Sequence, residues 1–274
     1  MNIFLVGLGL IGASYAQGLK KTEHKIFGYD QDETILKQAK QDGLIEKDSS
    51  LNDIKKADLV IIALYPKHIP LFLRQHRHLF NPKQTLTDVC GIKTWLLKEI
   101  ETCLPANLHY TSHHPMAGKE ISGYDAKDYT IFENANFIIV KTAQTRKDDI
   151  LRLKQLATDL KFKDPSIMPA QKHDELIAYT SQLTHVIACS LTIGSNEENL
   201  NEATGNSYQD LTRIAKINAD LWSELFLNNQ GALLKAITDF KTALNTLETA
   251  IDNEDTTALK RLLNKAKKRR DAYD

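Results

Sequence analysis

Three glycines near the N-terminus have the spacing of a loop that could bind a dinucleotide. They fall in the sequence Gly-Leu-Gly-Leu-Ile-Gly, a G-x-G-x-x-G pattern that follows the apolar run at residues 3–6. The first glycine would allow a tight turn, the second would let a pyrophosphate approach the backbone, and the third would let a helix pack close to a strand. Free N–H groups at the start of that helix would then face the phosphates. We therefore assign to a cofactor site the residues of this loop: Gly7, Leu8, Gly9, Leu10, Ile11 and Gly12.

Asp30 supplies the second part of the same pattern. It follows a predicted strand at residues 25–29, where its carboxylate would accept hydrogen bonds from ribose hydroxyls and repel a 2′-phosphate. Because Asp32 adds negative charge nearby, NAD is favoured over NADP. Three residues at the end of the apolar run 58–64 are assigned to the same site: Ala63, Leu64 and Tyr65. The alternatives are a glycine turn used only for packing, or the FAD and methyltransferase-like proteins that share the fingerprint, because it names no reaction.

Histidines supply the candidate acid–base chemistry. His113 and His114 precede Pro115 in the segment 112–118, which we expect to form a loop after a strand at residues 108–112. Proline restricts the residue before it, so the direction of His114 should be well fixed. A histidine of near-neutral pKa can accept the proton of a hydroxyl that is being oxidised. The alternative role for His114 is that of a loop histidine bonded to the backbone. His185 and Arg213 are two further candidates for the site. Their alternatives are a core histidine and a surface arginine, respectively.

The elements that would position these residues alternate between strand and helix. Strands are predicted at residues 3–6, 25–29, 58–64, 85–89, 108–112 and 137–140, with helices at 12–20 and 34–41. This alternation predicts an α/β fold with a Rossmann-type, doubly wound parallel sheet. After Met168 the apolar period is helical, at 169–193, 219–247 and 256–270. We therefore predict two domains, residues 1–167 and an all-helical 168–274.

Composition narrows the partners of the 274-residue chain. Lys plus Arg and Asp plus Glu are both 35, so the basic excess typical of a nucleic-acid-binding protein is absent. No apolar stretch reaches the roughly 18 residues of a membrane span, and the N-terminus lacks the basic segment of a signal peptide. The three cysteines have no CxxC spacing, and no metal-binding cluster is apparent. These features indicate a cytoplasmic protein without a metal; Cys90 is either a reactive thiol or an ordinary small residue.

The motifs together resemble the prephenate dehydrogenase family. They are GLGLIGAS at 7–14, TDVCGIK at 87–93, HHPMAGKEISG at 113–123, SQLTHVIA at 181–188, and DLTRIA at 210–215 followed by Trp222. The resemblance implies a Rossmann domain, a helical dimerisation domain and a homodimer. It also implies NAD-dependent oxidative decarboxylation of prephenate to 4-hydroxyphenylpyruvate in tyrosine biosynthesis. An arogenate dehydrogenase, another dehydrogenase of this architecture and a non-catalytic dinucleotide-binding protein stay open as alternatives.

The same resemblance implies roles for individual residues. His114 matches the catalytic histidine, and His185 and Arg213 match residues that contact the substrate, the arginine through a carboxylate. Glu120 matches an acidic loop residue that helps to close the site, and Lys93 the lysine of the turn after the fourth strand. Gly91 departs from the family, because many members have a serine there that would hydrogen-bond the reacting hydroxyl or the histidine. Ser112, Cys90 or a water could replace that hydroxyl, and a second departure is Gln209, where some relatives carry a lysine.

Overall fold

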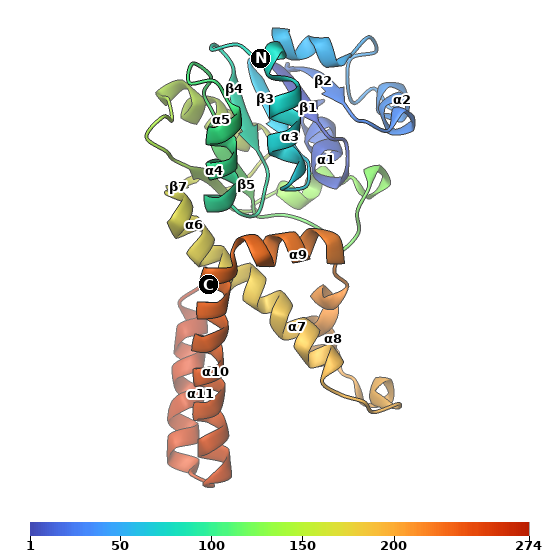
Figure 1. Cartoon of the computed structure of the whole chain (residues 1–274). Coiled ribbons are helices and arrows are strands. Elements are labelled where there is room, and N and C mark those ends of the chain that lie inside the picture. The colour runs from blue at the N-terminus through green and yellow to red at the C-terminus, as the bar shows by residue number, and fades with distance from the viewer. Residues whose placement is uncertain (274) are drawn as a thin grey trace. The chain divides into compact units, whose positions relative to one another are not determined.

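A four-stranded parallel sheet forms the centre of the N-terminal half. The computed structural model describes residues 1–273, in two compact units that comprise residues 1–229 and the chain from Gln230 onward. The strand order is β2-β1-β3-β4, with every neighbouring pair parallel. The strands are β1 (Asn2–Val6), β2 (Lys25–Tyr29), β3 (Leu59–Ile62) and β4 (Thr85–Asp88). The predicted doubly wound parallel sheet is therefore confirmed (Figure 1).

Alternating side chains give this sheet a core on each face. Ile3 and Leu5 of β1 belong to one buried cluster, and Phe4 and Val6 to the other, because successive strand residues point to opposite faces. The first cluster includes residues of α1 (Leu10–Leu19) and α5 (Lys147–Asp159). The second includes residues of α3 (His68–Gln75) and α4 (Thr94–Cys103). The short α2 (Glu33–Gln41) follows β2 and is capped by the Asp32 carboxylate.

A second, three-stranded sheet continues the domain and corrects two predictions. It contains β5 (Ser112–Pro115), β6 (Phe137–Val140) and β7 (Ser166–Met168), with β5 antiparallel and β7 parallel to β6. The predicted strand at 108–112 is wrong, because Tyr110 makes only a single parallel bridge to Leu86 and the ladder begins at Ser112. His113 and His114 consequently lie on a strand and not in a loop. The strand β7 was not predicted.

Helices make up the rest of the first unit. A continuous run comprises α6 (Ala170–Ile177), a π-helical turn (Ala178–Gln182) and α7 (Leu183–Ile193), and α8 (Asn206–Thr212) and α9 (Ala219–Asn228) follow. Within residues 169–273 the structure contains no strand, which confirms the all-helical C-terminal part. By length and composition alone Ala170–Ile193 could cross a membrane, but Asp174 within it is buried. A single helix of this kind is weak evidence of a membrane span, because helices of soluble proteins pass the same test.

The second unit is a pair of helices, α10 (Gln230–Asp252) and α11 (Thr256–Asp271). Asp255 caps α11 by accepting a hydrogen bond from the Ala258 N–H at 2.8 Å. The helical stretch predicted at residues 219–247 is confirmed as helical but is divided in two, because α9 ends at Asn228 and α10 begins at Gln230. Asn229 lies between them with its side chain buried in hydrogen bonds to Asp174 and Gln182. These bonds account for the interruption.

Candidate active site

The glycine loop follows β1, on the same side of the sheet as the ends of β3 and β4. Gly7 has a φ of +85°, and a Cβ added there would lie 2.6 Å from the Ala63 carbonyl oxygen. A Cβ on Gly12 would lie 1.9 Å from the Gly7 carbonyl oxygen, so both positions exclude side chains. No atom lies within 4 Å of a Cβ on Gly9, which leaves this stretch of backbone open to a ligand. The loop thus has the features that a bound pyrophosphate requires.

The N-terminus of α1 and Asp30 complete the candidate cofactor site. Gly9 is the N-cap of α1 and has no side-chain cap, so the first N–H groups of the helix are available to phosphate oxygens. One Asp30 oxygen accepts the Leu8 N–H at 2.7 Å, which ties the end of β2 to the glycine loop. The strand order reverses direction between β1 and β3, and ligands of such sheets bind at that switch point. The residues present therefore fit a dinucleotide.

A buried ion pair joins the ends of β4 and β5. The Lys93 ammonium donates to Asp88 Oδ1 at 2.8 Å and to the His113 carbonyl oxygen at 2.6 Å, and both charged side chains are fully buried. Asp88 also accepts hydrogen bonds from the hydroxyls of Tyr110 and Ser112. With its ammonium enclosed in this way, Lys93 orients the strand ends instead of presenting a charge to a ligand. Ser112 is engaged with Asp88, so its hydroxyl is not directed to a substrate.

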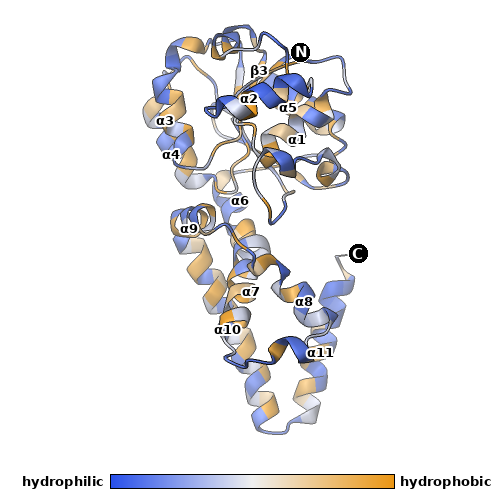
Figure 2. Ribbon diagram, turned by 90° about the vertical axis from the view of Figure 1, so that its right-hand side faces the viewer, coloured by the Kyte–Doolittle hydropathy of each residue, from blue (hydrophilic) through white to orange (hydrophobic). Residues whose placement is uncertain are grey.

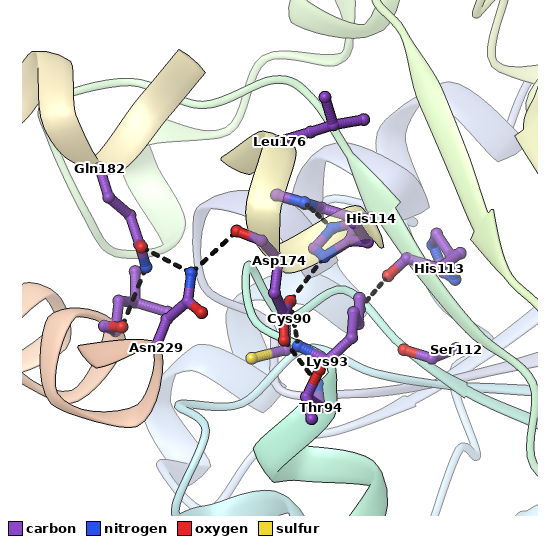
Figure 3. Close-up of polar contacts among 12 residues, drawn as sticks. Cys90, Lys93, Thr94, Ser112, His113, His114, Asp174, Leu176, Gln182 and Asn229 are labelled. Carbon is purple, nitrogen blue, oxygen red and sulfur yellow. Dashed lines mark hydrogen bonds and ion pairs between the residues drawn. The ribbon is translucent and has the colours of Figure 1, made fainter. Parts of the chain in front are cut away.

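The two neighbouring histidines have different surroundings, since they point to opposite faces of β5. His113 is fully buried, with Nδ1 2.7 Å from the Thr87 hydroxyl and Nε2 3.0 Å from the Tyr15 hydroxyl. His114 (Figure 3) is partly exposed, and its Nδ1 lies 2.9 Å from His173 Nε2 on α6. Burial lowers the pKa of His114 well below its usual value, and electrostatic interactions with His173, Lys93 and His113 lower it further. The His114 imidazole is therefore neutral at physiological pH.

His173 and Asp174 extend this contact, and the sequence analysis missed both. His173 Nδ1 lies 2.8 Å from Asp174 Oδ1, and the same carboxylate accepts the backbone N–H groups of Lys93 and Thr94 at 2.9 and 2.7 Å. Burial acts to raise the pKa of Asp174, but the hydrogen bonds from His173 and Thr94 lower it. The available signal was periodicity: His173 lies one helical turn before Ile177, on the buried face of α6.

Gly91 lies beside the edge of the His114 ring that carries Cε1 and Nε2. A Cβ at residue 91 would lie 3.7 Å from both Cε1 and Nε2 of His114, and 3.6 Å from Leu225 Cδ2 of α9. Nε2, the atom not bonded to His173, therefore faces the turn after β4. Burial raises the pKa of the neighbouring Cys90 thiol to about 12, so Cys90 is an ordinary buried residue and not a reactive thiolate.

A second group of side chains gathers around His185 on α7. Its ring stacks on Trp222 of α9, with ring centroids 3.6 Å apart, and its Nδ1 lies 2.9 Å from the Ser181 carbonyl oxygen. A carbonyl can only accept, so Nδ1 carries a hydrogen and Nε2 is the atom free to accept from a ligand. Burial lowers the pKa of His185. Arg213, in the turn Arg213–Ala215 against α7, forms an ion pair with Glu120.

Helix α9 contacts both the side chains around His114 and those around His185. Leu225 faces Gly91 and Trp222 stacks on His185, and these α9 residues are three positions apart on one helical face. The Gln182 amide fixes the helix by donating to the Leu225 carbonyl oxygen at 2.9 Å. The groups around His114 and His185 thus border the same face of α9. Among residues 1–273 no group of three or more potential ligands is placed to hold a metal ion.

The fold and the site together define a class. A glycine loop at the switch point of a parallel sheet, with a neutral histidine at the neighbouring strand ends, is the arrangement of a dinucleotide-dependent dehydrogenase. The model of the family domain "Prephenate dehydrogenase, nucleotide-binding domain" matches residues 15–163, and that of "Prephenate dehydrogenase, dimerization domain" matches residues 169–265. The chain belongs to the prephenate dehydrogenase family.

Individual relatives agree with this assignment. A prephenate dehydrogenase of Bacillus subtilis is 30% identical over 98% of this chain and 75% of its own length. A cyclohexadienyl dehydrogenase of Zymomonas mobilis is 27% identical over 93% of this chain and 89% of its own. Among solved structures, prephenate dehydrogenase of Aquifex aeolicus in complex with hydroxyphenyl propionate and NAD+ has a TM-score of 0.89 and 26% identity, covering 100% of this chain and 98% of that one. Arogenate dehydrogenase of Synechocystis has a TM-score of 0.85 and 25% identity, with both chains fully covered. These matches confirm the predicted family and enzyme class.

Proposed function

We propose that the protein catalyses the NAD-dependent oxidative decarboxylation of prephenate to 4-hydroxyphenylpyruvate. The observation that carries the proposal is His114, a neutral imidazole whose Nε2 faces the turn after β4, on the side of the sheet where the glycine loop lies. Similarity to dehydrogenases named for prephenate, one of them solved with NAD+, supports the choice of substrate and cofactor.

The proposed cofactor contacts come from the glycine loop, the start of α1 and Asp30. The N–H groups at the start of α1 would hold the pyrophosphate, and Asp30 would accept hydrogen bonds from ribose hydroxyls. Ala63 and Leu64 form the opposite wall of the loop, since a Cβ at Gly7 would contact both. NAD, when bound, supplies the hydride acceptor of the reaction.

His114 acts on the alcohol of the substrate ring. Because the imidazole is neutral, Nε2 can accept the hydroxyl proton as the alcohol becomes a carbonyl. Loss of carbon dioxide then makes the ring aromatic, so the overall reaction is strongly downhill. The work of the protein is to hold the reacting groups in place and to accept one proton.

Arg213 is the proposed anchor for a substrate carboxylate. Its side chain is 62% exposed and its guanidinium pairs with Glu120, so a carboxylate ligand would compete with Glu120 for the same donors. His185, stacked on Trp222, would contact the substrate through Nε2. Lys93 keeps only a positioning role in this proposal, because its ammonium is enclosed.

The proposed assembly is a cytoplasmic homodimer formed through the helical domain, residues 168–274. The match to a domain described as a dimerization domain supports it. The helices of that part are orange over many positions in Figure 2, which marks apolar residues. Large apolar side chains exposed there also support a dimer: Leu191, Ile193, Leu211, Leu227, Leu234, Leu244, Ile251 and Leu263. Apolar side chains exposed in such number are typical of a surface that another chain covers.

One assay tests the proposed function against its rival. Purified protein is supplied with prephenate or arogenate, each with NAD and with NADP, and reduced cofactor is followed by absorbance. We expect the highest kcat/KM with prephenate and NAD. Preference for arogenate would favour the second candidate, which the similarity to the Synechocystis enzyme supports. Cofactor binding without turnover of either substrate would overturn both.

A further inference from the structure

Two consecutive contacts link the proposed base to a buried carboxylate: His114 to His173, and His173 to Asp174. We propose that His173 and Asp174 are positioning residues that keep the proton of neutral His114 on Nδ1, so that Nε2 is the atom that accepts. The proposal rests on the proposed role of His114 as the base. It concerns which ring nitrogen is ready to react, a property that can be measured without turnover.

The Asp174 carboxylate acts as a hydrogen-bond acceptor toward all of its partners. The backbone N–H groups of Lys93 and Thr94 donate to its two oxygens, and the hydrogen bonds that it receives favour the ionised form. An ionised carboxylate has no hydrogen to donate. The 2.8 Å contact from His173 Nδ1 to Asp174 Oδ1 therefore requires a hydrogen on His173 Nδ1.

The hydrogen on His173 Nδ1 in turn determines which nitrogen of His114 carries a hydrogen. Burial lowers the pKa of His173, more than the nearby Asp174 raises it, so the ring is neutral and has a hydrogen on only one nitrogen. With that hydrogen on Nδ1, Nε2 of His173 can only accept. The 2.9 Å contact to His114 must then be donated by His114 Nδ1, which leaves His114 Nε2 with a free lone pair facing Gly91.

The same arrangement has a consequence for charge. When His114 Nε2 takes the substrate proton, the substrate O–H bond breaks, an N–H bond forms, and His114 becomes a cation while its Nδ1–H bond to His173 is unchanged. Lys93 nearby disfavours that cation, although its ammonium is paired with Asp88. Asp174 supplies a compensating negative charge through His173. The proton itself does not need to travel beyond His114.

Gly91 makes this role of His173 more important. Residue 91 has no side chain to bond His114, and within residues 1–273 the hydrogen bond found for the His114 ring is the one to His173. The orientation and the tautomer of His114 therefore both depend on α6. Asp174 adds a mechanical link, since it also accepts the first N–H groups of α4 and so joins that helix to α6.

The experiment reads the tautomer directly by imidazole nitrogen NMR in the full-length protein. Wild-type His114 should show a hydrogen on Nδ1. His173→Phe keeps a ring but removes the acceptor, and should move His114 toward the Nε2–H form. His173→Gln is the matched variant, because its amide can accept from His114 and donate to Asp174; it should keep the Nδ1–H form. Thermal unfolding of each variant reports whether it is folded.

Kinetics give the second readout. We expect His173→Phe to lower kcat by about 10- to 100-fold with KM changed less than about twofold, and His173→Gln to retain most of the activity. An Nε2–H tautomer in the wild type would overturn the proposal even if His173→Phe did not fold. An unchanged tautomer in folded His173→Phe would also overturn it. The expected NMR result without turnover of prephenate or arogenate would refute the proposed function and leave the tautomer assignment standing.

Discussion

Replacing Gly91 by serine tests how the proposed base is tuned. The backbone of Gly91 lies outside the left-handed region, and a Cβ there would make only van der Waals contacts of 3.6–3.7 Å with Leu225 and His114. Gly91→Ser should therefore fold, and the smaller unfolded-state entropy should stabilise it by about 0.4–1 kcal/mol. Gly91→Ala is the matched control, because it adds the same Cβ without a hydroxyl.

The expected effect follows from where the new hydroxyl would lie. The serine Cβ would lie 3.7 Å from His114 Nε2, and the hydroxyl is one bond further along the side chain. The hydroxyl can therefore donate a hydrogen bond to the lone pair of Nε2. Such a bond contributes about 0.5–1.5 kcal/mol and favours the neutral imidazole, so it lowers the pKa of His114 by roughly half to one pH unit. The base form then persists to lower pH. The acid limb of kcat/KM should move to lower pH in Gly91→Ser and not in Gly91→Ala.

The measurement is a pH profile of kcat/KM for the wild type and both variants, with the His114 ring proton followed by NMR over the same range. Burial already lowers the pKa of His114, so the NMR titration is the more direct reading. Identical titration of His114 in Gly91→Ser and Gly91→Ala would refute the placement of Nε2 beside residue 91. A shift of the acid limb of kcat/KM to higher pH would refute the claim that the serine hydroxyl lowers the pKa of His114.

Three further substitutions test other parts of the site. His114→Asn should lower kcat by about 10²- to 10⁴-fold with little change in KM, and steady-state kinetics with unchanged kcat would remove His114 from the mechanism. Arg213→Ala should raise KM for prephenate by roughly 10- to 100-fold, from loss of a charge-assisted pair; normal saturation would exclude the carboxylate role. Lys93→Met leaves buried Asp88 without its cation and should destabilise the protein by about 3–5 kcal/mol in urea unfolding; unchanged stability would contradict the importance of that ion pair.

Local sequence determined much of the N-terminal fold. The apolar runs that became β1, β3 and β6 are short and continuous, and a parallel sheet covered on both faces requires such strands. The need for glycine in the loop could also be predicted from the sequence, and the structure gives the reason: at Gly7 and Gly12 any side chain would meet backbone atoms. These features depend on residues close together in the chain.

The errors came from partners that are distant in the chain. His113 and His114 look like loop residues, but His113 fits a buried strand because the hydroxyls of Tyr15 and Thr87 satisfy its ring. The break at Asn229 depends on Asp174 and Gln182, both many residues earlier. Hydrophobic periodicity carries no information about such pairings, and His173 was missed for the same reason. The roles of His185, Arg213 and Glu120 came from family resemblance and stay predictions.

The bond between Asp30 and the glycine loop has a consequence for changing the cofactor by design or in evolution. The carboxylate proposed to select NAD also accepts the Leu8 N–H at 2.7 Å and the Asp32 N–H at 3.0 Å. Removing it to admit a 2′-phosphate would also free the backbone proposed to bind the pyrophosphate, a part common to NAD and NADP. A single substitution at residue 30 would therefore weaken both cofactors before it favours either. A variant that uses NADP would first need another acceptor for the Leu8 N–H, so the proposed preference for NAD should change only through several substitutions together.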